Sequence, residues 1–204
     1  MYTPANNRID NLNEAVMFMQ RYSFATIINV IDGKPEATHL PFLIEQRDGK
    51  ITLSSHFAKA NPQAKAIDGS EVLVIFTEPH AYISPSHYEK ETNVPTWNYL
   101  AVHAYGKAKE LAEVADKFRL LAHTINQYEA AYMQQWESLP DIYRDGLIKG
   151  ITAFEIEVTN LQAKKKLSQN KTELERNNII NALKNSADTN ERDIAAYMQA
   201  LDKK

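Results

Sequence analysis

The chain has 204 residues, of which 44% are hydrophobic and 24% are charged, and its formal net charge at pH 7 is −3. This composition is typical of one large folded domain, or a domain with an appendage, and it excludes a disordered chain. The lack of excess positive charge argues against binding to a nucleic-acid backbone. Because the sequence contains no cysteine, disulfides, iron–sulfur clusters, thiolate zinc sites and cysteine nucleophiles are excluded as well.

The N-terminal stretch Met1–Asp10 lacks the apolar segment of a secretory signal. The longest clean apolar run, Val72–Phe76, is far shorter than the roughly 20 residues of a membrane-spanning helix. Together with the missing cysteines, these features indicate a cytoplasmic protein without membrane contact.

Local patterns predict the elements of the first part of the chain. Asn11 and Glu14 have the spacing of a helix capping box, which predicts a helix over 11–21. Apolar, β-branched runs predict three strands, over 24–31, 37–44 and 51–55. Asp32-Gly33 and Asp48-Gly49 stand between them as hairpin turns. The three strands therefore form an antiparallel meander, because a two-residue loop cannot connect parallel strands.

Asn61-Pro62 then predicts a short helix or a corner before the next strand. Further strands are predicted over 71–77, 81–85, 97–108 and 151–158. Further helices are predicted over 110–131, 172–184 and 189–201, with a shorter helix or an ordered loop over 132–149. Thr172 and Glu175 repeat the capping-box pattern. Six or seven strands in meander order with peripheral helices indicate a mainly β protein, most simply a small antiparallel barrel with helices attached.

The sequence carries none of the motifs GxGxxG, GxxxxGK[ST], GxSxG or HExxH, which argues against the standard nucleotide, hydrolase and zinc-protease sites. Polar and aromatic residues gather instead in three segments, 56–62, 81–106 and 166–171. These segments combine flat aromatic surfaces such as Trp97 with amides, hydroxyls and cations such as Lys166. An aromatic, phosphorylated cofactor requires this combination.

These segments resemble the PaiB family of FMN-binding negative transcriptional regulators, whose fold is related to FMN-binding split barrels such as pyridoxamine phosphate oxidase. The matching stretches run in order over residues 1–171: Met1-Tyr2 with Pro4, Ala37–Phe42, His56–Pro62, Tyr82–Tyr88, Val94–Tyr99, Val102–Gly106 and Lys166–Asn170. The sequence departs from the family at Lys59, Ala64 and His87, where Arg, an aromatic residue and Trp are more frequent. Lysine in place of arginine keeps the charge and loses the bidentate fork.

The resemblance implies a six-stranded antiparallel FMN-binding split β-barrel over 1–171 and a C-terminal helical extension over 172–204. It also implies a homodimer with FMN at the subunit interface, the ring lying against the strands at 38–41 and 96–98. The implied cofactor-binding residues are Thr38, His39, Leu40, Pro41, His56, Lys59, Asn61, Thr96, Trp97, Asn98, Lys166, Ser168, Gln169 and Asn170. Lys59 and the segment 166–169 are expected to meet the phosphate. Which subunit supplies which group is left open, and no metal site or catalytic residue is implied.

The implied function is an FMN-binding protein of PaiB type, acting as a negative transcriptional regulator or as a flavin-dependent redox protein. The alternative is a haem-handling or flavin oxidoreductase enzyme on the same barrel, because five histidines lie between positions 39 and 103. Trp97 could also serve as a core or dimer-interface aromatic. Direct DNA contact is disfavoured, because Lys164–Lys166 reads as a solvated strand end and the last helix carries Glu191, Asp193 and Asp202 beside Arg192.

Overall fold

The computed structural model describes residues 1–47 and 49–201, and the side chain of Arg47 is left out of the description. The chain divides into two compact units. The terminal unit consists of 1–15, 76–103 and the chain from 162 onward, and the sheet unit consists of 16–75 and 104–161. The predicted boundary between residues 171 and 172 stays a prediction.

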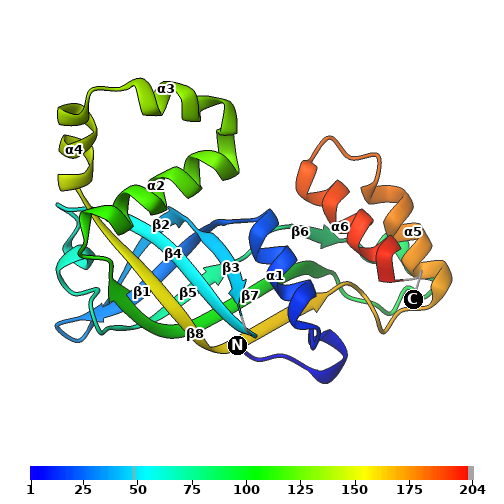
Figure 1. Ribbon diagram of the computed structural model, residues 1–204. Coiled ribbons are helices and arrows are strands. Elements are labelled where there is room, and N and C mark those ends of the chain that lie inside the picture. Colours follow the sequence, from blue (N-terminus) through cyan, green and yellow to red (C-terminus); the bar gives the residue numbers. More distant parts are fainter. Residues whose placement is uncertain (48, 202–204) are drawn as a thin grey trace. The chain divides into compact units, whose positions relative to one another are not determined.

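Figure 1 shows the elements in chain order. The strands are β1 (Phe24–Ile31), β2 (Lys34–Pro41), β3 (Leu43–Arg47), β4 (Lys50–Ala58), β5 (Glu71–Phe76), β6 (His80–Ile83), β7 (Thr96–Glu110) and β8 (Ile151–Lys166). The helices are α1 (Leu12–Arg21), α2 (Val114–Glu129), α3 (Met133–Ser138), α4 (Asp141–Lys149), α5 (Glu173–Leu183) and α6 (Thr189–Leu201). Short 3-10 turns are η1 (Ala5–Asn7), η2 (Pro62–Lys65), η3 (Pro85–His87) and η4 (Ala130–Tyr132). No helix within the described ranges is both long and apolar enough to cross a membrane.

The strands form one sheet of eight strands in the order β2-β1-β5-β7-β8-β4-β3, with β6 paired to β7. The mainly β, antiparallel class with attached helices is confirmed, although the sheet has eight strands rather than six and is open, with β2 and β3 at the two ends of the order. The predicted meander is wrong, because β2 and β3 are not neighbours in this order. The strand expected over 37–44 is interrupted at Phe42, whose N–H donates to the Ser23 carbonyl over 2.9 Å. The chain therefore leaves the first hairpin there and begins a second one.

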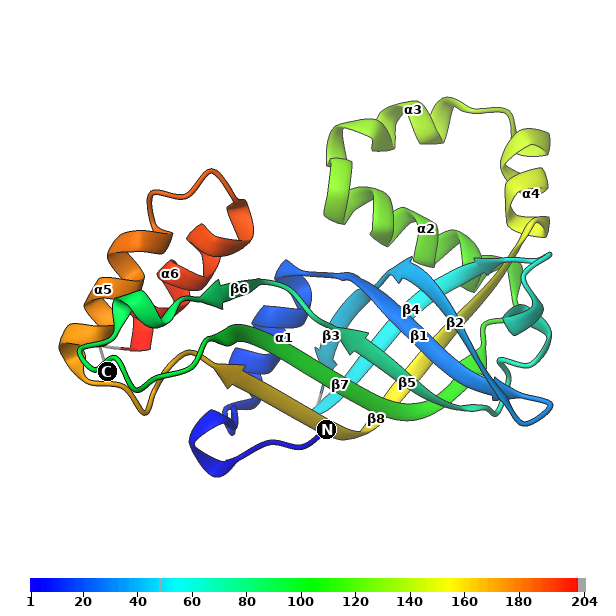
Figure 2. The same cartoon turned by 180° about the vertical axis from the view of Figure 1, so that it is seen from behind.

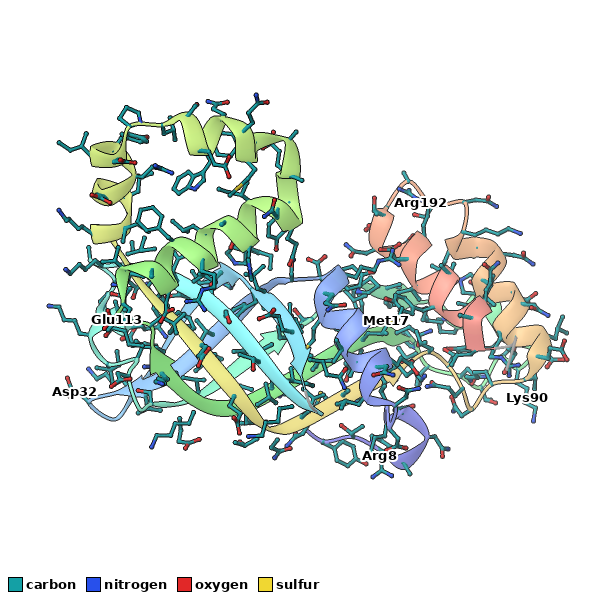
Figure 3. The ribbon with its side chains drawn as sticks, viewed as in Figure 1. Arg8, Met17, Asp32, Lys90, Glu113 and Arg192 are labelled. Atoms are coloured by element: carbon teal, nitrogen blue, oxygen red, sulfur yellow. The ribbon has the colours of Figure 1, made fainter. Side chains whose placement is uncertain are left out.

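The first hairpin follows the prediction. β1 has the predicted bounds and pairs with β2 from Phe24 opposite Pro41 to Ile31 opposite Lys34. At its tip, Asp32 and Gly33 have φ values of 52° and 76°, the left-handed conformation that a tight hairpin turn requires. Figure 3 labels Asp32 at this tip. Asp48, which belongs to the second predicted turn, lies outside the described residues.

The helix starts predicted from capping signals are confirmed. The Asn11 Oδ1 accepts hydrogen bonds from the N–H groups of Asn13 and Glu14, over 2.9 Å and 3.3 Å, at the start of α1. Thr172 and Glu175 form a complete capping box at the start of α5. The segment expected as a helix or loop over 132–149 contains two helices, α3 and α4. In the sheet unit, α2 runs along the strands and α3 stands away from them (Figures 1 and 2).

The core of the sheet unit contains a group of phenylalanine rings. Phe57 stacks on Phe154 at 4.9 Å between ring centroids, and the edge of Phe42 meets Phe154 at 6.3 Å. All three side chains are almost completely buried. A Cβ at Gly106 would lie 2.3 Å from the carbonyl oxygen of Glu157. Only glycine therefore allows β7 and β8 to approach as closely as they do.

Candidate functional site

The predicted site residues fall into two groups, one in each unit. The sheet unit carries Thr38, His39, Leu40, Pro41, His56, Lys59 and Asn61. The terminal unit carries Thr96, Trp97, Asn98, Lys166, Ser168, Gln169 and Asn170. Within each unit, the structure brings several of these residues into direct contact.

In the sheet unit, a hydrogen-bond network joins β2 to η2. The amide of Asn61 donates to the Thr38 hydroxyl over 2.9 Å, and the Asn61 Oδ1 accepts from the N–H of Gln63 over 2.9 Å. Thr38 in turn donates to the Gln63 Oε1. Gln63 is 2% exposed and also binds Asn29 and the Glu36 carbonyl. No local pattern identifies Gln63 as a site residue, although it directly follows the Asn61-Pro62 pair.

His39 and Pro41 point to the opposite face of β2 from Thr38. The His39 Nδ1 lies 2.9 Å from the hydroxyl of Thr26, and its ring stacks with Phe24 at 6.4 Å. Pro41 stands opposite Phe24 in the strand register. Leu40, like Thr38, alternates to the other face and is partly buried. The backbone of β2 thus presents predicted site residues on both faces.

His56 and Lys59 lie at the end of β4 and just beyond it. His56 is partly buried, and this burial lowers the pKa of its imidazole, which is therefore neutral at pH 7. The backbone N–H of Lys59 donates to the Gly150 carbonyl over 2.8 Å, while its side chain is exposed. Among the described residues, no carboxylate forms an ion pair with the Lys59 ammonium.

In the terminal unit, Lys166 ends β8 and a turn over 167–170 follows it; we call the segment Lys166–Asn170 the lysine turn. The Lys166 ammonium donates to the hydroxyl of Thr96 on β7. The hydroxyl of Ser168 donates to the Asn98 Oδ1 over 3.1 Å. The Gln169 side chain closes the turn, accepting from the Leu167 N–H and donating to the Lys165 carbonyl, each over 2.7 Å.

The polar residues of the lysine turn and of β7 differ in how deeply they are buried. Asn98 is fully buried and Ser168 is 5% exposed, and their side chains form a hydrogen bond with each other. Lys166 is only partly buried, and it meets no carboxylate within ion-pair distance in the part of the chain that the structure describes. Asn170 is exposed. The turn therefore holds one partly buried cation ready for an anion.

Trp97 is 52% exposed, which does not fit the alternative of a core aromatic. Its ring meets the edge of Tyr82 at 5.7 Å and lies 5.9 Å from the His80 ring. The three rings cover one face of the β6–β7 pair, while Asn98 on the opposite face is buried and its amide lies 3.5 Å from the Met198 sulfur of α6.

The five histidines noted in the sequence do not form one cluster in either unit. His39 and His56 belong to the sheet unit, and His80, His87 and His103 belong to the terminal unit. Burial, followed by the charge of the N-terminal ammonium, lowers the pKa of His103. Within the described ranges, no group of three or more metal-ligating side chains of His, Asp or Glu is found.

Comparison with known proteins identifies the family. The family model described as "Putative FMN-binding domain" matches residues 1–160. Protease synthase and sporulation protein PAI 2 of Bacillus subtilis (strain 168) is 39% identical over 202 residues, which cover 98% of this chain and 97% of that relative. The expected resemblance to the PaiB family is therefore confirmed.

Solved structures with a similar fold include two flavin proteins. The FAD and heme binding protein from Mycobacterium smegmatis has a TM-score of 0.61 at 16% identity, covering 78% of this chain and 73% of its own. The flavocytochrome Anf3 from Azotobacter vinelandii has a TM-score of 0.59 at 15% identity, covering 76% and 67%. These neighbours support the split-barrel fold. The chain belongs to the FMN-binding domain family, as a split-barrel protein of PaiB type, and its cofactor is FMN.

Proposed function

We propose that the protein is a flavin-dependent redox protein that binds the FMN phosphate at the lysine turn of the terminal unit. The observation that carries this proposal is Lys166, a partly buried ammonium whose neighbour is the Thr96 hydroxyl and not a carboxylate. A dianionic phosphate supplies the missing negative charge, and hydroxyl groups complete its oxygen contacts. A role of Lys59 at the phosphate stays a prediction from the family resemblance.

Within the lysine turn, the roles divide by accessibility. We assign Lys166 and Thr96 to direct contact with the phosphate. The buried pair Asn98 and Ser168, together with Gln169, holds the turn in its conformation, because its polar atoms are engaged inside the protein. Direct contact of FMN with that pair stays a prediction from the family resemblance. FMN supplies the electron transfer, so the protein needs to bind, orient and shield the ring.

A titration of the flavin-free protein with FMN and with riboflavin, followed by flavin fluorescence, tests this proposal. The two ligands differ by the phosphate, so the wild-type protein is expected to bind FMN at least about tenfold more tightly. Lys166→Ala is expected to remove most of that difference, while Lys149→Ala, an exposed lysine on α4, leaves it intact. Equal affinity of the wild-type protein for the two ligands contradicts the phosphate site.

We also propose that the protein is a homodimer and that a second copy covers the exposed face of β1 and β2. Phe24 and Val30 are 68% and 64% exposed on that face, opposite Pro41 and Pro35. The predicted site residue His39 lies on the same face, opposite Thr26. An exposed apolar sheet face of this kind fits a subunit interface.

Light scattering of the FMN-bound protein tests the dimer. Phe24→Glu places a charge in the proposed interface and is expected to give monomers with weakened FMN binding. Ile142→Glu, at an 85% exposed position on α4, serves as the matched control and is expected to stay dimeric. A wild-type protein that is monomeric with FMN bound contradicts this interface.

The proposed redox role is compatible with the regulatory role of the PaiB family. We propose that any such regulation acts through a partner other than DNA. The net charge of the chain is −3, and α6 carries Glu191 and Asp193 beside Arg192. Asp202, which was expected on the same helix face, lies outside the described residues. This acidic helix repels a phosphate backbone. A cytoplasmic location remains part of the proposal, supported by the absence of cysteine.

A further inference from the structure

The amide network around Gln63 is fixed in direction by two backbone groups. A carbonyl oxygen can only accept a hydrogen bond, so the Glu36 carbonyl, 3.1 Å away, requires the amide nitrogen of Gln63 to face it. The second hydrogen of that nitrogen points to the Asn29 Oδ1 over 2.9 Å. The Gln63 Oε1 is thereby turned toward Thr38, whose hydroxyl donates to it.

The second backbone group acts on Asn61. A backbone N–H can only donate, so the N–H of Gln63 fixes the Asn61 Oδ1 as its acceptor at 2.9 Å. The amide nitrogen of Asn61 must then point to the Thr38 hydroxyl oxygen, to which it donates over 2.9 Å. Both neighbours of the Thr38 hydroxyl are therefore oriented by backbone atoms that cannot reverse their roles.

These fixed neighbours determine which hydrogen bonds the Thr38 hydroxyl can still form. Its only hydroxyl hydrogen is committed to Gln63, and one lone pair accepts from Asn61. A hydroxyl oxygen has two lone pairs, so one remains, and Thr38 is only partly buried. Toward a ligand, Thr38 can accept a hydrogen bond but cannot donate one.

Asn29 supplies the second acceptor for the Gln63 amide nitrogen. Its Oδ1 is held by Gln63, and its amide nitrogen is buried without a hydrogen-bond partner among the described residues. Asn29 is 2% exposed, so this unpaired donor costs free energy. A reversed amide would move the oxygen away from Gln63 and break the chain of bonds that reaches Thr38.

We propose that Gln63 is a positioning residue that fixes Thr38 as a hydrogen-bond acceptor, so that the site selects a ligand ring with an N–H group. The inference rests on the proposed function and on the flavin ring lying against β2, as the family resemblance implies. The ring system of oxidised flavin has one N–H, at N3, and its other polar ring atoms are acceptors. An acceptor placed against Thr38 would be repelled, so Thr38 and Gln63 together favour the N3–H edge.

The experiment compares FMN with 3-methyl-FMN, which lacks that N–H, by fluorescence titration of the flavin-free protein. The wild-type protein is expected to bind FMN about tenfold more tightly than the methylated analogue. Thr38→Ser keeps the hydroxyl and is expected to keep the preference. Thr38→Val and Gln63→Leu are expected to lose it, because the first removes the acceptor and the second frees the hydroxyl to rotate. Thr52→Val, a partly buried threonine on β4, is the matched control and keeps the preference.

The outcomes distinguish FMN binding by the protein from the roles of Thr38 and Gln63. A wild-type protein that binds neither flavin overturns the proposed function itself. Equal binding of both flavins, with a tight FMN complex, overturns only the role of Thr38. A full preference in folded Gln63→Leu overturns the positioning role of Gln63. If Gln63→Leu does not fold, the comparison of Thr38→Val with Thr38→Ser decides whether Thr38 accepts from the ring.

Discussion

Replacing Asn98 by leucine tests how the lysine turn is held. Asn98 is fully buried, and its Oδ1 accepts the hydroxyl of Ser168 over 3.1 Å. Leucine has the same branched shape as asparagine but no acceptor, so it leaves the Ser168 hydroxyl, which is 5% exposed, without its partner. An unpaired buried hydroxyl costs about 1–3 kcal/mol, and the free energy of unfolding is expected to fall by that amount.

A double-mutant cycle separates this bond from general damage to the core. Ser168 has a φ of 59°, and Ser168→Ala keeps a side chain in the same left-handed conformation while removing the hydroxyl. Because the double variant has no unpaired hydroxyl, it is expected to lose about 1 kcal/mol less than the sum of the two single variants. Urea denaturation measures the stabilities, and an FMN titration is expected to show weaker binding in both single variants. If the stability losses of the two single variants add up in the double variant, or if FMN affinity is unchanged, the Asn98–Ser168 hydrogen bond does not hold the lysine turn.

Three further predictions concern the fold and its pH dependence. Gly106→Ala is expected to destabilise the protein by about 1–3 kcal/mol in urea denaturation, since the new Cβ meets the Glu157 carbonyl and β7 must shift. Phe154→Ala is expected to cost about 3–5 kcal/mol, because it leaves a cavity beside Phe57, and a loss below about 1 kcal/mol would contradict the packing. Burial keeps the pKa of His56 below 6.5 in the folded protein. The contribution of His56 to stability is therefore constant above pH 6.5 and is lost as the pH falls through the folded pKa. His56→Gln is expected to reduce the fall of the melting temperature at acidic pH, measured by thermal melts.

The correctly predicted parts of the fold are those determined by residues that lie close together in the sequence. Asp32-Gly33 defines a hairpin turn by itself, and the Thr172 capping box marks a helix start within four residues. Strand order depends on pairings between distant segments, such as β1 with β5 and β4 with β8, which no local pattern contains. The extension of β8 to Lys166 was missed for a related reason, because Thr159 and Asn160 are exposed and polar.

In the candidate site, too, some residues could be identified from the sequence and others could not. Family resemblance supplied Lys166 and Asn98, and the structure adds that one is a partly buried cation and the other a fully buried support. Gln63 could not be identified from local sequence, because its partners Asn29 and Thr38 lie 34 and 25 residues away. Buried polar residues of this kind acquire their role only when distant strands are brought together.

An absorption spectrum shows whether this chain binds FMN. The purified protein is measured as isolated, and again after incubation with FMN followed by desalting. A retained spectrum with the two bands of a bound flavin, at about one FMN per chain, is the predicted result. A protein that stays colourless after incubation with FMN would contradict the account.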